Sequence, residues 1–81
     1  MYLHIGKDVL INNKDIVGIF NIDYIKNTKE YKSMYKSLNE AGLIIDISAN
    51  QPKTFIIIEK DKKIKGYITN IGAVTIGKRK M

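Results

Sequence analysis

The sequence predicts a small α+β domain in which a mostly antiparallel β-sheet carries one main helix. Three observations support this: short β-branched runs separated by turn residues near the start, one segment with helical spacing of apolar residues, and two further apolar runs after it. With 81 residues the chain is expected to form a single domain, residues 1–81. A domain of this size buries a thin core, so we expect it to associate with copies of itself.

The first third of the chain has the pattern of three strands. The runs YLHIG (2–6) and VLIN (9–12) are separated by two polar residues and predict a hairpin. The run DIVGIFNID predicts a third strand from Ile16 to Ile22, in which Gly18 marks a bulge or the close approach of another backbone. We expect Asp15, just before this strand, to cap a turn.

The main helix is predicted from Thr28 to Ala41. Its larger apolar residues recur at intervals of three and four, which is the spacing of one helix face. Asn27 or Thr28 can cap the first turn, and Gly42 stands where a left-handed residue would end the last turn. The outer face of this helix carries three lysines, which are Lys29, Lys32 and Lys36.

The two apolar runs after the helix, LIIDIS (43–48) and TFIII (54–58), are typical of strands in the middle of a sheet with both faces covered. Asp46 interrupts the first run, and we expect this buried carboxylate to accept a hydrogen bond from a loop amide or to pair with a lysine. Asp61 to Lys63 predict a hairpin turn, and Ile64 to Thr69 predict the returning strand.

Two alternatives stay open for the end of the chain, and the tyrosines divide between the core and the surface. Residues 70–81 contain two glycines that weaken a helix, so we expect either a short C-terminal helical turn or a docked extended segment. Tyr31 and Tyr35 fall on the apolar stripe of the helix and are expected in the core. Tyr67 lies among lysines on an expected solvent face, where it could stack on a base.

The residue types argue against an enzyme. The chain has one histidine, His4, and no cysteine, so neither a catalytic triad nor a histidine- or thiolate-based metal site can be assembled within it. No glycine-rich phosphate loop is present. We therefore predict no catalytic residues, no metal and no cofactor. The start of the chain lacks the pattern of a signal peptide and no apolar run reaches membrane-spanning length, which predicts a cytoplasmic protein.

The charge of the chain favours a polyanionic partner. Fourteen basic residues against eight acidic ones give a formal charge of +6, and all the basic residues except Arg79 are lysine. A lysine ammonium is a point charge suited to phosphates, whereas the planar guanidinium of arginine reads guanine edges with two hydrogen bonds. The composition therefore favours contact with phosphates over the reading of bases.

Four stretches, taken in order, resemble one protein family: MYLHIGKD at the start, DIVGIFN, GLIIDIS after the helix, and NQPKTFIII. They resemble the RemA/RemB family of bacterial extracellular-matrix (biofilm) regulators and are most similar to its RemB branch, also called YaaB-like. The resemblance implies a transcription regulator that binds duplex DNA, in which RemA-type proteins form rings of identical subunits with a basic outer surface.

The resemblance also implies which residues would contact DNA. In the RemA branch the segment that corresponds to NQPKT carries arginines important for DNA binding, and here it offers Lys53 and Thr54. An arginine typical of RemA before the third strand is replaced by Asp15, with Lys14 beside it. We expect Pro52 to fix the loop so that Lys53 and Thr54 present a charge and a hydroxyl to phosphates. The candidate DNA-binding residues are Lys14, Lys53, Thr54, Lys29, Lys32 and Lys36.

Two other functions remain open from the sequence. A homo-oligomeric scaffold that binds a protein partner through a sheet edge or through Ile71 to Ile76 would use its lysines for solubility, and the loss of the RemA arginines favours it. An RNA-binding protein would use Tyr67 and the hairpin lysines and would prefer single strands.

Overall fold

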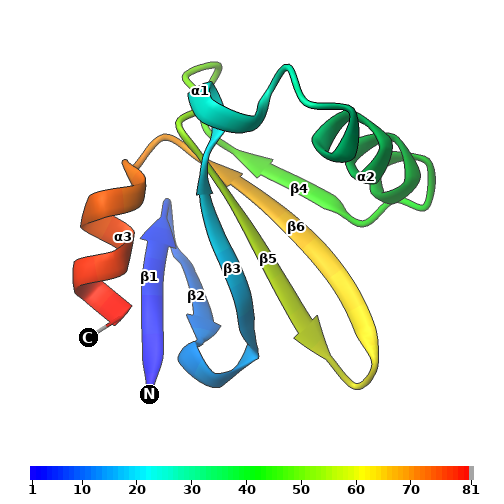
Figure 1. Cartoon of the computed structure of the whole chain (residues 1–81). Coiled ribbons are helices and arrows are strands. Elements are labelled where there is room, and N and C mark those ends of the chain that lie inside the picture. The colour runs from blue at the N-terminus through cyan, green and yellow to red at the C-terminus, as the bar shows by residue number, and fades with distance from the viewer. Residues whose placement is uncertain (81) are drawn as a thin grey trace.

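The computed structural model of the chain describes residues 1–80 and confirms the α+β class (Figure 1). Six strands and three helices are joined by short loops, with one 3-10 turn before the third strand. In chain order the elements are β1 (Tyr2–Gly6), β2 (Val9–Asn12), η1 (Asn13–Asp15), β3 (Ile16–Asn21), α1 (Ile22–Ile25), α2 (Lys29–Glu40), β4 (Ile44–Ile47), β5 (Thr54–Lys60), β6 (Lys63–Thr69) and α3 (Ala73–Lys80).

The strands form two sheets. Strands β1 and β2 pair as the predicted antiparallel hairpin. The other four strands form a sheet in the order β3-β5-β6-β4, in which β4 runs parallel to β6 and the remaining pairs are antiparallel. The prediction that the run 43–48 is a central strand is therefore wrong, because β4 lies at the edge. Its apolar character reflects cover on both faces, since Ile44 packs with one core cluster and Ile45 with the other.

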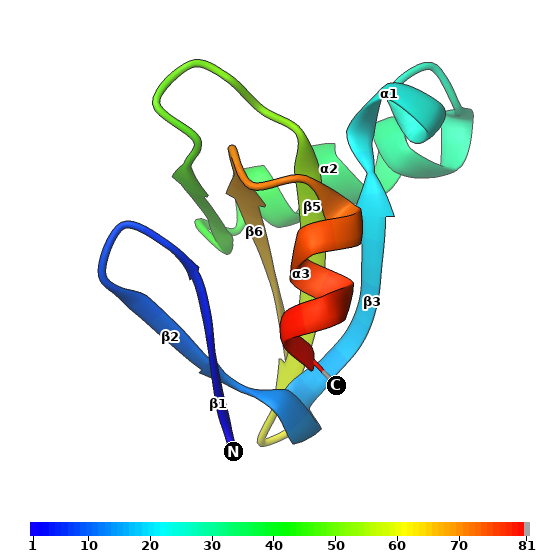
Figure 2. The same cartoon turned by 90° about the vertical axis from the view of Figure 1, so that its left-hand side faces the viewer.

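Each face of the four-stranded sheet packs into its own core. On one face the β1–β2 hairpin and α3 lie against β5, and on the other α2 lies against β4, β6 and part of β5 (Figure 2). The first cluster consists of Leu3, Ile5, Ile11, Ile47, Ile56, Ile58 and Ile76. The second consists of Ile22, Phe55, Ile57 and Ile68, with the tyrosines of α2 packed on it.

Helix α2 begins and ends as its sequence predicts. The Thr28 hydroxyl oxygen accepts a hydrogen bond from the Tyr31 amide at 3.2 Å, which caps the first turn. At the other end Gly42 is left-handed, with φ 72°. The Leu43 amide donates to the Leu38 carbonyl at 2.8 Å, the six-to-one hydrogen bond of a Schellman motif.

Several details before α2 differ from the prediction. Strand β3 stops at Asn21 because the Asn21 side chain accepts a hydrogen bond from the Asp23 amide and starts α1. The turn before β3 is capped by Asn12 and not by Asp15, since Asn12 Oδ1 accepts from the Lys14 amide. The bulge predicted at Gly18 is confirmed by a register shift between Ile16 and Gly18.

The C-terminal segment is helical, which was the first of the two expected alternatives, but the helix, α3, is longer than the short turn that we expected and has eight residues. Gly77 weakens this helix locally, but the helix is stabilised from outside because Ile76 is completely buried in the first core cluster. Arg79 Nη1 also donates a hydrogen bond to the His4 carbonyl in β1, at 3.0 Å. Tertiary packing thus overrides a weak local helix preference.

The close packing at Gly66 yields a stability prediction. A Cβ atom at Gly66 would lie 2.7 Å from a ring carbon of Phe55, so we expect Gly66→Ala to lower the free energy of unfolding by about 1–3 kcal/mol. A Cβ at Gly77 would meet nothing within 4 Å, and the helix preference of alanine should raise stability by up to about 1 kcal/mol there. Urea unfolding of the two variants measures both changes, and equal signs would contradict the packing argument.

Candidate nucleic-acid interface

The loop between β4 and β5 contains Lys53 and is held in one conformation by its own hydrogen bonds. Asp46 Oδ1 accepts from both the amide and the hydroxyl of Ser48, at 2.8 and 2.6 Å. The Gln51 amide donates to the Ser48 carbonyl across two residues with positive φ, Ala49 and Asn50. Such a pair of left-handed residues is the mark of a type I′ turn. Asp46 therefore accepts from a loop amide as predicted, but its side chain is exposed and not buried.

Lys53 is fixed by its backbone while its side chain is exposed. Its amide donates to the Thr69 carbonyl at 2.9 Å, and its carbonyl accepts from the Ile22 amide at 3.0 Å. These two bonds join the end of β6 to the start of α1. The ammonium of Lys53 therefore projects from an ordered position at one end of the sheet, which reduces the conformational entropy lost when a ligand binds.

Thr54 does not present its hydroxyl to the outside, so this part of our prediction is wrong. Its side chain is completely buried, and its Oγ1 donates to the Ile71 carbonyl at 2.6 Å. The reason is strand register: Thr54 pairs with Asn21 and Thr69 in the middle of the sheet, so its side chain points into the core beneath the C-terminal segment. Thr54 is a structural residue and leaves the set of candidate contacts.

The remaining candidate lysines do not come together within one subunit. In the β3–β5 pair Asn21 is opposite Thr54 and Ile16 is opposite Ile58, so Lys53 and Lys14 lie at opposite ends of the sheet. The lysines of α2 are exposed on the side of the helix that faces away from the sheet, as predicted. The candidates therefore belong to three separate surfaces, one with Lys53, one with Lys14, and one with Lys29, Lys32 and Lys36.

Very little of the positive charge is neutralised inside the molecule. Among the described side chains a single ion pair forms, between Lys26 Nζ and Asp23 Oδ1 at 3.4 Å. Every described lysine side chain is exposed. The uncompensated charge is therefore available to a polyanion.

The tyrosines are less available for base stacking than the lysines are for phosphates. Tyr67 is half-buried and packs against the first core cluster, because it pairs with Ile56 on the face that the β1–β2 hairpin covers. The expectation that it lies on a solvent face is wrong. Tyr31 and Tyr35 pack on the second core cluster, as predicted, and the Tyr31 ring meets Phe55 edge-on with centroids 5.2 Å apart.

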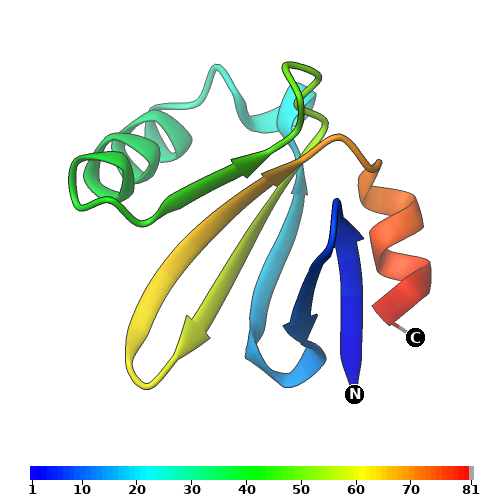
Figure 3. The same cartoon turned by 180° about the vertical axis from the view of Figure 1, so that it is seen from behind.

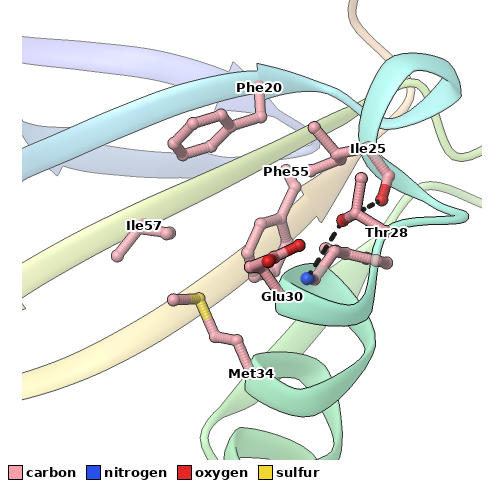
Figure 4. Close-up of a pocket in the computed structure, with 8 residues that line it drawn as sticks. Phe20, Ile25, Thr28, Glu30, Met34, Phe55 and Ile57 are labelled. Carbon is pink, nitrogen blue, oxygen red and sulfur yellow. Dashed lines mark hydrogen bonds between the residues drawn. The ribbon is translucent and has the colours of Figure 1, made fainter.

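An apolar groove between β3 and α2 was not foreseen from the sequence (Figure 4). It has a volume of about 150 Å³, and α2 leaves it open because the helix covers the β4–β6 side of the sheet. Burial raises the pKa of the Tyr31 hydroxyl in its wall, and Tyr35 and Asp46 raise this pKa further. The other lining residues are Phe20, Ile25, Thr28, Glu30, Met34, Phe55 and Ile57.

Two of the groove residues, Phe20 and Met34, are apolar and more than a third exposed. Both could have been noticed in the sequence, since Met34 widens the helix stripe and Phe20 follows Gly18 by two residues on the same strand face. The sequence does not show that they face one another across an opening. Among residues 1–80 no helix is both long and apolar enough to cross a membrane.

Comparison with known proteins identifies one family. The sequence model of that family matches residues 2–79, which is nearly the whole chain, and the family is described as RemA-like, extracellular matrix regulatory protein A-like. The match confirms the family resemblance of the four sequence stretches. It describes the family as a whole, so the similarity to the RemB branch stays a prediction. No curated protein matches the chain.

The structural role of Thr54 can be tested without any ligand. Thr54→Val keeps the shape of the side chain but leaves the Ile71 carbonyl without its donor, so we expect the free energy of unfolding to fall by about 1–3 kcal/mol. The matched replacement at an exposed threonine of α3, Thr75→Val, should change the free energy of unfolding by less than about 0.5 kcal/mol. Denaturant unfolding measures both changes, and an unchanged Thr54→Val variant would contradict a structural role for this hydrogen bond.

Proposed function

The chain belongs to the RemA-like family of extracellular matrix regulatory proteins, and on this basis we propose that it regulates transcription by binding duplex DNA as a homo-oligomer. The contacts would be made mainly to phosphates and would involve no catalysis. Lys53, Lys14 and the three lysines of α2 are the proposed contacts, while the buried Thr54 is excluded.

The observation that carries this proposal is the uncompensated lysine charge. The formal charge is +6, and the one ion pair of the described residues neutralises only Lys26. Binding to duplex DNA releases condensed counterions in proportion to the phosphates neutralised, so dispersed lysines can contribute to affinity without any shared pocket. Lysine ammoniums position a protein on the backbone more than they read its sequence.

The separation of the candidate lysines favours a homo-oligomer. A single subunit places Lys14 and Lys53 at opposite ends of its sheet, where they cannot both serve one short stretch of backbone. Repeated copies bring equivalent lysines to successive phosphates, and linked sites can raise avidity by about 10²- to 10⁴-fold when the geometry permits simultaneous contact.

We assign the apolar groove to contact between copies. A chain of this size gains from burying additional apolar surface, and Phe20 and Met34 are 38% and 41% exposed in the single subunit. The same groove is the observation that favours the alternative function, a scaffold that binds a different protein. The RNA-binding alternative loses its stacking residue, because Tyr67 is half-buried beneath the hairpin.

DNA binding is tested by titrating a labelled duplex by fluorescence anisotropy across a salt series, after the oligomeric mass has been measured in the same buffer. We expect log K to fall linearly with log salt, with a slope of about −0.9 for each phosphate contacted. Lys53→Gln should reduce the slope by about 0.9 for each subunit in contact with the duplex.

The matched control is Lys26→Gln, which removes the same charge from a lysine already paired with Asp23 and should leave the slope unchanged. An intact oligomer that fails to bind at low salt would exclude DNA binding and favour the scaffold. Competition by unlabelled single-stranded RNA that exceeds competition by duplex would favour the RNA-binding alternative.

The role of the groove is tested by the mass of the assembly. Met34→Glu places a carboxylate in the apolar groove, where its burial between copies is costly, so we expect a shift to smaller species in light scattering. Ser33→Glu adds the same charge to an exposed position of α2 and should leave the mass unchanged. If Met34→Glu keeps the full mass but loses a protein partner, the groove belongs to the scaffold function.

A further inference from the structure

Three lysines share one face at the free end of the β5–β6 hairpin, a part of the sheet that neither α2 nor α3 covers (Figure 3). In the antiparallel register Lys60 is directly opposite Lys63, and Lys65 is directly opposite Ile58. Directly opposed residues point to the same face of a sheet, and alternate residues along a strand do too. The three lysine side chains therefore lie on the face to which Ile58 belongs.

This end of the hairpin is concave. Ile58, Lys60, Asp61, Lys63 and Lys65 line a cleft with a volume of about 180 Å³, which we call the hairpin cleft. Ile58 belongs to the first core cluster and supplies an apolar wall. A water molecule accounts for about 30 Å³ of the liquid, so the cleft has room for a phosphate group.

The charges in the hairpin cleft repel one another and have no internal partner. Like charges directly opposite on neighbouring strands are destabilising, and Lys60 faces Lys63 in this way. Glu59 cannot neutralise them because it pairs with Ile64 on the other face of the sheet. Asp61 lines the cleft, yet among the described side chains it forms no ion pair, since the only pair is between Lys26 and Asp23.

The backbone holds this arrangement in place without a ligand. Asp61 and Lys62 have φ of 53° and 66°, and two consecutive positive values are typical of the two-residue type I′ turns that join tight hairpins. The turn fixes the opposition of Lys60 and Lys63, so the repulsion cannot be relieved by a change of register. Lys14 adds a fourth cation at the same end of the sheet, because β3 begins with Ile16 opposite Ile58.

We propose that the hairpin cleft binds a phosphate group and that, in the function proposed above, this phosphate belongs to the backbone of the duplex. A bound phosphate replaces the repulsion between Lys60 and Lys63 with attraction to both, and the apolar wall of Ile58 limits the competing water. Three point charges without a planar guanidinium suit a tetrahedral oxyanion and read no base. The assignment of this phosphate to DNA rests on the proposed function, whereas the binding of a phosphate group by the cleft does not.

The phosphate chemistry is tested without DNA, with inorganic pyrophosphate as the probe. At ten times its dissociation constant, pyrophosphate should raise the melting temperature of the protein by roughly 5–10 °C over sodium chloride of equal ionic strength. The rise should be lost in the double variant Lys60→Gln/Lys63→Gln, which we call the cleft variant. It should be kept in the control variant Lys7→Gln/Lys26→Gln, which removes the same charge from two exposed lysines that lie at the opposite end of the sheet and are not among the proposed DNA contacts.

A second arm uses the duplex titration to identify the source of the phosphate. If the phosphate belongs to the duplex, the cleft variant should lose about 0.9 from the salt slope for each cleft in contact. An unchanged slope in the cleft variant, with pyrophosphate stabilisation lost, would overturn the duplex as the source and identify a free phosphorylated ligand.

The outcomes separate this inference from the proposed function. If the native protein binds no DNA but its stabilisation by pyrophosphate is lost in the cleft variant, the proposed function is refuted and the phosphate-binding cleft remains supported. Equal stabilisation of the native protein, the cleft variant and the control variant would overturn the cleft, because the effect would then be general salt exclusion from the surface. Far-UV circular dichroism of each variant verifies that it is folded.

Discussion

Burial of β5 on both faces is the constraint on which the rest of this structure depends. The first five residues of β5, Thr54 to Ile58, are all buried. Phe55 and Ile57 lie on the side of α2, and the other three lie on the side of the β1–β2 hairpin. A strand with two buried faces needs two covering layers, and this small chain supplies both. The hydroxyl of Thr69 links the layer of the β1–β2 hairpin to the sheet by donating to the Ile5 carbonyl at 2.5 Å.

The same constraint decides where charge can lie. Because β5 has no exposed side chain between Thr54 and Ile58, lysines occur only outside this buried segment, at Lys53 before it and from Lys60, the last residue of β5, onward. The buried core thus divides the basic residues into separate surfaces and leaves no single continuous patch on one subunit. A surface divided in this way is compatible with a long, repetitive ligand such as a phosphate backbone, for which contacts at several places add up.

Prediction from the sequence succeeded where one local rule dominates. The limits of α2 follow from Thr28 and Gly42, whose capping geometry depends on a few neighbouring residues. Prediction from the sequence failed where the structure depends on contacts between segments that are distant in the chain. The apolar run of β4 could not reveal an edge position, Tyr67 could not be seen to lie under the hairpin, and α3 forms because Ile76 and Arg79 find partners about seventy residues away in the chain.

The sequence by itself determined the α+β class, the main helix, the excess of lysine charge and the resemblance to the RemA-like family, since composition, periodicity and local motifs carry this information directly. Only the tertiary structure decided which polar residues are available to a ligand. It buried the hydroxyl of Thr54, separated Lys14 from Lys53, and placed Lys60 opposite Lys63 across a cleft. The physical reason is that exposure and opposition depend on strand register and on the layers that cover each face, which join residues far apart along the chain.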